Sequence, residues 1–190
     1  LVVFGRSAAL RAADILTPGA KQPELKASHT DAHLARFDRL RNAKGGTPTA
    51  QLRLDMQKAM QEDAAVFRTE QLMAEGKAAM AATYQKMQDI KVSDRGLIWN
   101  SDLVETMELD NLIGAATVTL HGAHAREESR GAHAHEDFPD RNDAEWMKHT
   151  AAWFNGWGGK GGEVRLDYRP VHEYTLTDDA EYIKPKKRVY

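Results

Sequence analysis

The sequence SDLVETMELDNLIGAATVTL, residues 101–120, places apolar side chains at the spacing of one helix face. Three or four residues separate the main members of this stripe, which are Leu109, Leu112, Ile113, Ala116 and Leu120. Asp102 and Glu105 lie near its start, where the positive end of a helix dipole favours acidic side chains. A face this wide has to be buried, so residues 101–120 predict one long helix that packs against others.

Two further segments with apolar faces precede this one. Thr47–Pro48 predicts a helix cap followed by proline in the first turn, and Leu52, Met56 and Met60 then recur every fourth residue. Arg68–Thr69 predicts a second cap, and the face behind it consists of Met73, Gly76, Met80, Tyr84 and Met87. Short links between three such helices predict an antiparallel bundle. We expect the methionines to form its core, because burial is their usual state and a methionine-lined partner groove is rarer.

The N-terminal region predicts two more helices. Residues 3–16 have helical spacing and end at Thr17-Pro18-Gly19. Asp31 is expected to cap a short helix that ends before Gly45–Gly46 and carries Leu34, Phe37 and Leu40. The opening LVVFGR, residues 1–6, is typical of the middle of a packed segment, so we expect the chain to be a piece of a larger protein.

The pattern changes from helical to strand-like towards the C-terminus. Residues 149–154 and 163–168 predict two strands around the glycine-rich turn at 156–162. The predicted fold is therefore mainly α, with a three-helix, spectrin-repeat-like antiparallel bundle followed by a small irregular α+β tail with a β-hairpin. The expected domains are residues 1–45, 46–128 and 129–190, for the end of another domain with its connector, the bundle and the tail.

Composition excludes several classes of function. The chain has no cysteine, which removes disulfides, thiolate metal sites and a cysteine nucleophile. A formal net charge of −2 gives no electrostatic reason to expect nucleic acid as a partner. No stretch approaches the roughly 20 apolar residues of a membrane-spanning helix.

Histidines and tryptophans of the C-terminal half offer rival interpretations. His121, His124, His133 and His135 lie among acidic residues and could hold a metal ion, although solvated or interdomain histidines are the stronger interpretation. Three tryptophans surround the predicted hairpin and are expected to fasten it to the bundle rather than stack on a ligand; they are Trp146, Trp153 and Trp157.

Several strings resemble the C-terminal region of succinate dehydrogenase and fumarate reductase flavoproteins, in the order of that family. They are LVVFGR (1–6), LDMQ (54–57), DRG (94–96), WNSDLVET (99–106), ESRGAH (128–133), DFPDR (137–141), WMKHT (146–150) and DYRPV (167–171). The resemblance covers essentially the whole chain and is strongest to the succinate dehydrogenases of alphaproteobacteria and mitochondria.

The resemblance implies a part of an oxidoreductase rather than a complete one. The family oxidises succinate to fumarate with a covalently attached FAD, and electrons pass to an iron–sulfur subunit and on to quinone. Its substrate and flavin residues are expected upstream of Leu1, so we assign no catalytic, cofactor-binding or metal residue here and expect the chain alone to be inactive. The implied partners are the flavin-binding domain of the same subunit and the iron–sulfur subunit, without nucleic acid. Membrane contact would be indirect, through anchor subunits, at the cytoplasmic side in bacteria or the matrix side in mitochondria.

The same resemblance implies contact residues and one departure. Arg130, Gly131 and His133 are expected to lie at a contact between the tail and the flavin-binding domain. The family usually has Arg where this chain has His135, which weakens any salt bridge from that position at neutral pH. An autonomous helical protein-interaction module without a catalytic role stays open as the alternative function.

Overall fold

The computed structural model describes residues 1–156, 163–175 and 177–186, in two compact units, Leu1–Ala35 and Arg36–Tyr190. The first contains α1 (Val2–Ile15), none of whose residues is buried, and most of α2 (Ser28–Arg41). The expected cap at Asp31 is wrong, because α2 begins at Ser28 and Asp31 lies within its first turn. The three-domain division of the sequence stays a prediction.

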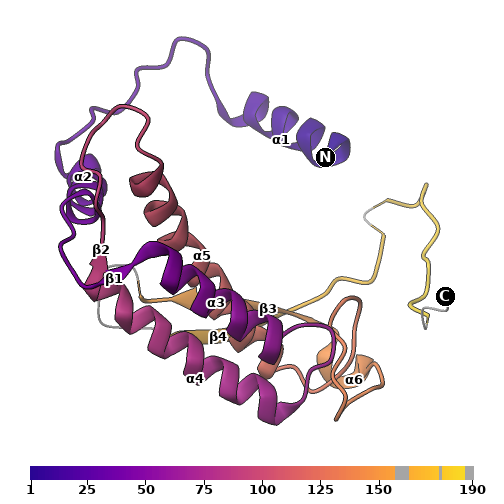
Figure 1. The fold of residues 1–190 in the computed structure, drawn as a ribbon. Helices are drawn as coiled ribbons and strands as arrows, with labels where there is room; N and C mark the ends of the chain where they lie inside the picture. The colour runs from indigo at the N-terminus through magenta and orange to yellow at the C-terminus, as the bar shows by residue number, and fades with distance from the viewer. Residues whose placement is uncertain (157–162, 176, 187–190) are drawn as a thin grey trace. The chain divides into compact units, whose positions relative to one another are not determined.

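Three long helices form the centre of the second unit, as expected (Figure 1). They are α3 (Thr49–Asp63), α4 (Glu70–Lys86) and α5 (Ser101–His124), and every pair of them is in contact. The Thr69 side chain accepts a hydrogen bond from the backbone N–H of Leu72 and so caps α4, as predicted. Asn100 caps α5 in the same way, accepting from Leu103 N at 2.8 Å.

The predicted cap at Thr47–Pro48 is wrong. These residues form the short strand β1 (Thr47–Pro48), which pairs in parallel with β2 (Ile90–Lys91) behind the 3-10 turn η1 (Met87–Asp89). The hydroxyl of Thr47 donates to Asp89 Oδ2 at 2.9 Å instead of turning back to α3. Helix α3 therefore starts after Pro48 without a side-chain cap. The carboxylate of Asp89 is well placed to bind Thr47, because it also accepts a hydrogen bond from the backbone N–H of Gly46, at 3.1 Å.

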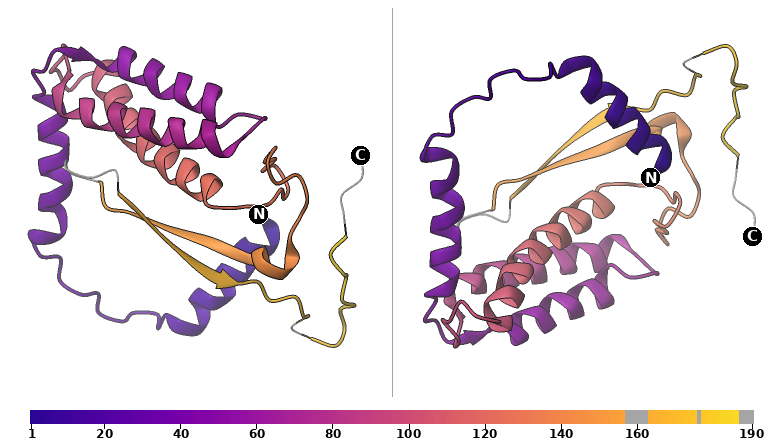
Figure 2. Two further views of the ribbon diagram at one scale, coloured as in Figure 1. Left: turned by 90° about the horizontal axis from the view of Figure 1, so that it is seen from below. Right: turned by 90° about the horizontal axis from the view of Figure 1, so that it is seen from above.

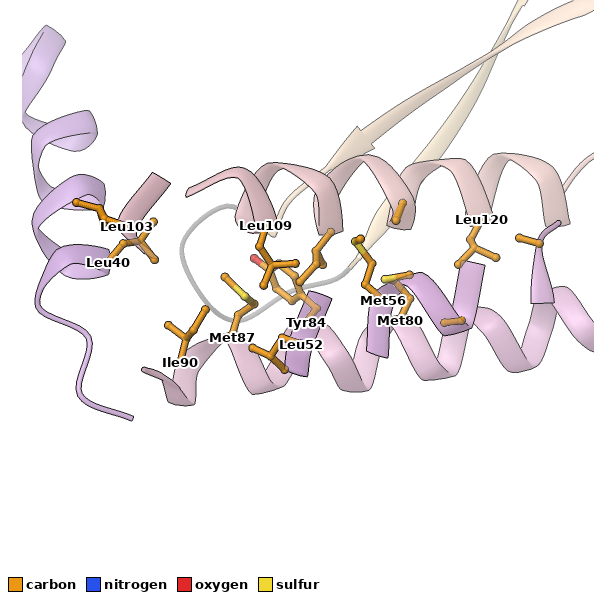
Figure 3. Close-up of a cluster of buried hydrophobic side chains, with 14 residues drawn as sticks. Leu40, Leu52, Met56, Met80, Tyr84, Met87, Ile90, Leu103, Leu109 and Leu120 are labelled. Carbon is orange, nitrogen blue, oxygen red and sulfur yellow. The ribbon is translucent and has the colours of Figure 1, made fainter. Parts of the chain in front are cut away.

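The core of the second unit lies between α3, α4 and α5 (Figure 3). Leu52, Leu109 and Leu120 are fully buried there, and the methionine faces point inward as expected. Met60 is only partly buried and Leu112 is 40% exposed, so these two members of the predicted stripes lie at its margin. At one end Leu40, from α2, packs beside Leu103. None of the described helices has the length and apolar character to cross a membrane.

The tail begins after α5 and contains one helical turn and a hairpin. These are α6 (Asp143–Trp146), β3 (Lys148–Phe154) and β4 (Val164–Pro170). The two strands pair antiparallel (Figure 2), which confirms the expected hairpin, and both strands contact α5. Phe154 meets the ring of Tyr84 edge-on at 5.4 Å and so joins the hairpin to the core. Most of the predicted glycine-rich turn, residues 157–162, lies outside the described residues.

Candidate functional site

The most concentrated polar chemistry of the chain surrounds the buried carboxylate of Glu128, which is 0% exposed. It accepts hydrogen bonds from Arg126 Nη1 at 2.5 Å, from Arg130 Nε at 2.7 Å and from Asn142 N at 2.8 Å. Burial alone would raise the pKa of Glu128, but the hydrogen bonds from Arg130, Asn142 and Arg126 outweigh it and lower the pKa. Glu128 is therefore a carboxylate at neutral pH, enclosed by two guanidinium groups.

Arg126, two residues beyond α5, fastens the end of the bundle to the tail. Its Nη1 also donates to the carbonyl of Trp146 at 3.0 Å, and its Nη2 donates to the carbonyl of Lys148 at 2.6 Å and to Thr150 Oγ1 at 3.2 Å. The guanidinium lies 5.0 Å from the ring centre of Trp146. One side chain thus ties the end of α5 to α6 and β3.

Arg130, an expected contact residue, is used within its own tail. Besides Glu128 it binds Asp143 Oδ1 at 2.6 Å through Nη2, and Arg141 binds the other oxygen of Asp143 at 2.9 Å. The hydrogen bond to Glu128, followed by that to Asp143, raises the pKa of Arg130. We call Arg126, Glu128, Arg130 and Asp143 the Glu128 network.

Gly131 and His133 shape the turn that follows. Gly131 adopts φ +60°, a conformation that glycine takes without strain, and the backbones of Arg130 and His133 bond to each other across the turn. His133 Nδ1 lies 2.9 Å from Arg68 Nη1, and its Nε2 lies 3.2 Å from the carbonyl of Arg126. Since a guanidinium can only donate, Nδ1 is the acceptor and Nε2 carries the proton, so His133 is neutral. The contact of Arg130, Gly131 and His133 with another domain stays a prediction.

The contact of Arg68 with the tail turn was not predicted from the sequence. Arg68 follows α3 and directs Nε to the carbonyls of Ala64 and Ala65, at 3.1 and 2.9 Å, while Nη1 reaches His133. Burial lowers the pKa of Arg68. One feature of the sequence could have indicated this contact. Arg68 directly precedes the N-cap of α4, and the positive end of a helix dipole disfavours a cation there.

His135 is buried, at 1% exposure, against the ring of Phe138 at 4.8 Å. Neither ring nitrogen has a hydrogen-bond partner among the described residues, and Nδ1 lies 3.9 Å from Asp137 Oδ2. The imidazole therefore fills space in the turn without a hydrogen bond from its ring to any described residue.

The other two histidines of the rival metal interpretation lie at the end of α5. His124 Nε2 is 2.8 Å from Glu70 Oε1, and His124 Nδ1 is 3.3 Å from Lys77 Nζ. Burial, with Lys77 and His124 nearby, lowers the pKa of His121. Over residues 1–156, 163–175 and 177–186, no three histidine or carboxylate side chains gather where they could hold a metal ion.

The tryptophans divide between two environments. Trp146 is buried, with the ring of Tyr168 at 5.7 Å and the ammonium of Lys148 at 4.4 Å from its centre, so it holds the hairpin as expected. Trp153 is 44% exposed and is covered by Arg165 at 3.9 Å. Trp157 lies outside the described residues.

The described residues do not fit a flavin site. A dinucleotide fold places a glycine turn between a strand and a helix, where backbone N–H groups meet the pyrophosphate. The described glycines with positive φ are Gly19 and Gly131, and neither lies in a strand–turn–helix unit. No step of flavin chemistry is therefore assigned to this chain.

The family model described as the fumarate reductase flavoprotein C-term matches residues 53–190. The chain belongs to that family. A mitochondrial succinate dehydrogenase flavoprotein subunit of Oryza sativa subsp. japonica is 49% identical over 190 residues, which are 100% of this chain and 29% of the rice protein. The succinate dehydrogenase flavoprotein subunit of Rickettsia conorii is also 49% identical, over 100% of this chain and 31% of its own length. The expected similarity to succinate dehydrogenase flavoproteins is confirmed.

The fold agrees with the same family. E. coli quinol fumarate reductase superposes with a TM-score of 0.79 at 31% identity, over 95% of this chain and 30% of that chain. The bundle followed by a hairpin-bearing tail is thus the C-terminal part of a flavoprotein subunit. The chain spans about 30% of the length of the relatives that it matches.

Proposed function

We propose that this chain is the structural C-terminal part of a succinate dehydrogenase flavoprotein subunit, whose parent oxidises succinate to fumarate with covalently bound FAD. The chemistry would lie in residues outside this chain, and the bundle and tail would hold and present the domain that carries it. The observation that carries this proposal is the Glu128 network. It joins the ESRGAH turn to the end of α5 through charged hydrogen bonds between Arg126, Glu128, Arg130 and Asp143.

Exposed apolar side chains support a docking role. Leu97, Ile98 and Trp99, in the loop before α5, are 65%, 91% and 97% exposed. Exposed apolar groups that are contiguous in this way mark surfaces that meet other proteins. We assign this loop of the second unit to contact with the rest of the flavoprotein subunit or with the iron–sulfur subunit.

The tail turn supplies the second proposed contact. Arg130, Gly131 and His133 would face the flavin-binding domain through the backbone and the outer edges of their side chains, because the guanidinium of Arg130 is already paired with Glu128 and Asp143. The assembled enzyme would lie at the inner membrane through its anchor subunits, on the cytoplasmic side in bacteria or the matrix side in mitochondria. The relatives carry bacterial and mitochondrial succinate dehydrogenase names, in keeping with that location.

A chimera tests the proposal. This chain replaces the matching C-terminal part of the Rickettsia conorii subunit, which is co-expressed with its own partner subunits. We expect covalently bound flavin and succinate-dependent dye reduction in the chimera, and neither flavin binding nor dye reduction in the 190-residue chain alone. A soluble, assembled chimera without flavin or activity would contradict the proposal, and so would succinate-dependent dye reduction by the chain alone.

A further inference from the structure

An asparagine followed by a glycine comes directly after the first strand of the hairpin. Strand β3 ends at Phe154, and Asn155 and Gly156 follow it outside any helix or strand. Asn155 is exposed, and its backbone N–H donates to the carbonyl of Glu163 at 3.2 Å. Within the described parts of the chain, the side-chain amide of Asn155 has no hydrogen-bond partner. This amide is therefore free to turn towards the backbone of the next residue.

The sequence contains five asparagines, and Asn155 differs from the other four in two ways. In each of the others a hydrogen bond to another residue holds the side-chain amide, and the next residue carries a side chain; they are Asn42, Asn100, Asn111 and Asn142. Asn100 is also buried, at 7% exposure. Only Asn155 combines an unbound amide with a successor that has no side chain to shield its backbone nitrogen.

The packing of the hairpin requires the glycine of this pair. Gly156 lies against the ring of Phe154, and a methyl group on its Cα would overlap that ring. Phe154 in turn meets Tyr84 of α4 edge-on at 5.4 Å, which joins the hairpin to the core. A larger residue at position 156 would therefore disturb this joint. The fold thus keeps an unshielded backbone N–H next to an exposed asparagine.

We propose that Asn155 is a site of spontaneous deamidation, which converts it through a cyclic imide to isoaspartate and aspartate. The backbone nitrogen of Gly156 attacks Cγ of Asn155, and a new C–N bond closes the ring. The bond from Cγ to Nδ2 breaks, and Nδ2 leaves as ammonia with the proton that the attacking nitrogen loses. Attack within one chain is favoured because the two groups are already held next to each other.

Water then opens the imide at one of two bonds. Cleavage between the Gly156 nitrogen and the backbone carbonyl carbon of Asn155 gives isoaspartate, whereas cleavage between that nitrogen and Cγ gives aspartate. In sum, one water is consumed and one ammonia is released, without an oxidant, a metal or a cofactor. The inference does not depend on the proposed function, because it concerns only the covalent chemistry of this chain.

The two products differ in their effect on the hairpin. Isoaspartate carries the main chain through Cβ and so adds one carbon between residue 155 and Gly156. This displaces Gly156 from the ring of Phe154 and weakens the contact of that ring with Tyr84. Aspartate adds only a negative charge at an exposed position, where its effect is small. Formation of isoaspartate should therefore loosen the turn end of the hairpin.

Peptide mapping by mass spectrometry tests the site after incubation of the 190-residue chain at pH 6 and at pH 8. We expect the peptide with Asn155 to give two acidic products at least about tenfold faster than Asn42 or Asn100 are converted. The conversion should be faster at pH 8, because the Gly156 nitrogen must lose a proton. Conversion no faster than that of Asn42 would overturn the proposal, and so would aspartate as the sole product.

Two variants at the same position separate the backbone change from the charge. Asn155→Gln keeps the amide but would need a larger imide ring, so it should stay unmodified in the same incubation. Asn155→Asp supplies the charge without the extra backbone carbon. Amide hydrogen exchange of β3 and β4 should become faster as the unchanged chain ages and stay constant in Asn155→Gln. Fresh Asn155→Asp should exchange as the fresh unchanged chain does.

Asn42→Gln is the matched control, because it replaces an exposed asparagine whose amide is bound to the carbonyl of Asp38. It should leave the conversion of Asn155 and the loss of hairpin protection unchanged. If Asn155→Gln lost protection during incubation as fast as the unchanged chain, ageing would act at another position and the proposed effect on the hairpin would be wrong.

Discussion

The bundle and the tail of the second unit are held together by opposite kinds of interaction. Between α3, α4 and α5 the buried residues are mainly Leu, Met and Ile, and cohesion is the removal of apolar surface from water. In the tail the most deeply buried side chains are Glu128 and His135, and Glu128 is held by hydrogen bonds and ion pairs with arginines. The bundle therefore tolerates changes that keep volume and polarity, whereas the tail depends on particular charges.

This difference assigns different tasks to the two regions. Apolar packing is non-directional, so the bundle can fold with any set of side chains that fills it. The Glu128 network is directional, because each oxygen of one carboxylate must meet a given N–H group. Only the second kind of interaction places a turn such as residues 129–135 in one orientation, which is what a contact surface requires.

Glu128→Ala is expected to have the largest effect. It leaves Arg126 and Arg130 without their shared anion, and removal of one partner from a buried ion pair costs about 3–5 kcal/mol. The tail should lose amide protection in hydrogen exchange over residues 126–150, while the bundle keeps its protection. Glu127→Ala, an exposed neighbour of the same type, is the control and should leave the tail protected. Equal loss of protection in tail and bundle would show that the two regions unfold as one.

Leu109→Ala probes the bundle in the same way. Leu109 is 0% exposed, and truncation of a buried leucine costs about 2–5 kcal/mol through lost burial and the cavity that remains. Urea unfolding followed by circular dichroism at 222 nm should show this as a lower midpoint with an unchanged slope. Leu112→Ala, on the same helix but 40% exposed, should cost clearly less. Similar losses for both variants would mean that the apolar stripe of α5 is not the inner face.

A buried polar pair inside the bundle sharpens the comparison. The hydroxyls of Thr49 and Thr106 lie 2.6 Å apart, and the Thr106 hydroxyl donates to the carbonyl of Asp102, so it accepts from Thr49. Thr49→Val keeps the shape and leaves Thr106 with a partner, so the loss of stability should be only about 0.5–1.5 kcal/mol by urea unfolding. Thr119→Val, which removes an exposed hydroxyl from α5, is the control and should be nearly neutral. A loss as large as that of Leu109→Ala would mean that polar contacts govern the bundle too.

The bundle could be predicted from sequence because its information is local. Spacing alone places Leu52, Met80 and Leu109 on inner faces, and the fixed helical period makes that inference transferable. Thr47 was assigned wrongly because its partner, Asp89, is distant in sequence and reaches it only after α4 has returned. The helix-capping propensity of Thr47 and its neighbours in sequence contains no information about a distant side chain, such as Asp89, that binds the same hydroxyl.

The tail could be predicted only in part. The pattern of residues 164–168 gave the second strand of the hairpin, and the ESRGAH string drew attention to Arg130. Neither pattern indicated that Glu128 would be the buried centre of the Glu128 network. Neither indicated that Arg68, in the connection between α3 and α4, would contact His133. Acidic residues are mostly exposed, so burial of one among several carboxylates depends on which arginines the fold brings to it.

Mild acid should weaken the tail turn by protonating His133. We expect this effect to be smaller than those of Glu128→Ala, Leu109→Ala and Thr49→Val. Burial lowers the pKa of His133, and the positive charges of Arg68 and Arg126 and the neighbouring His135 lower it further, against the carbonyl of Arg126, which raises it. Because the folded pKa lies below the unfolded value of 6.5, the unfolded chain binds more protons as pH falls. The contribution of His133 to stability is complete above the unfolded pKa and is lost as pH falls from there towards the folded pKa.

The measurement for His133 is hydrogen exchange of the tail amides at pH 7.5 and 5.5, corrected for the intrinsic rate. His133→Gln supplies an acceptor for Arg68 and a donor for the carbonyl of Arg126 but cannot titrate, so its protection should change less between the two pH values. His149→Gln, at an exposed position of β3, should behave as the unchanged chain. Glu128 keeps its charge over this range, since its pKa is lowered from 4.5, so the network itself stays intact. If His133→Gln and the unchanged chain responded identically to pH, another group would be responsible for the acid sensitivity. His121 of α5 would be the first to examine, because burial lowers its pKa as well.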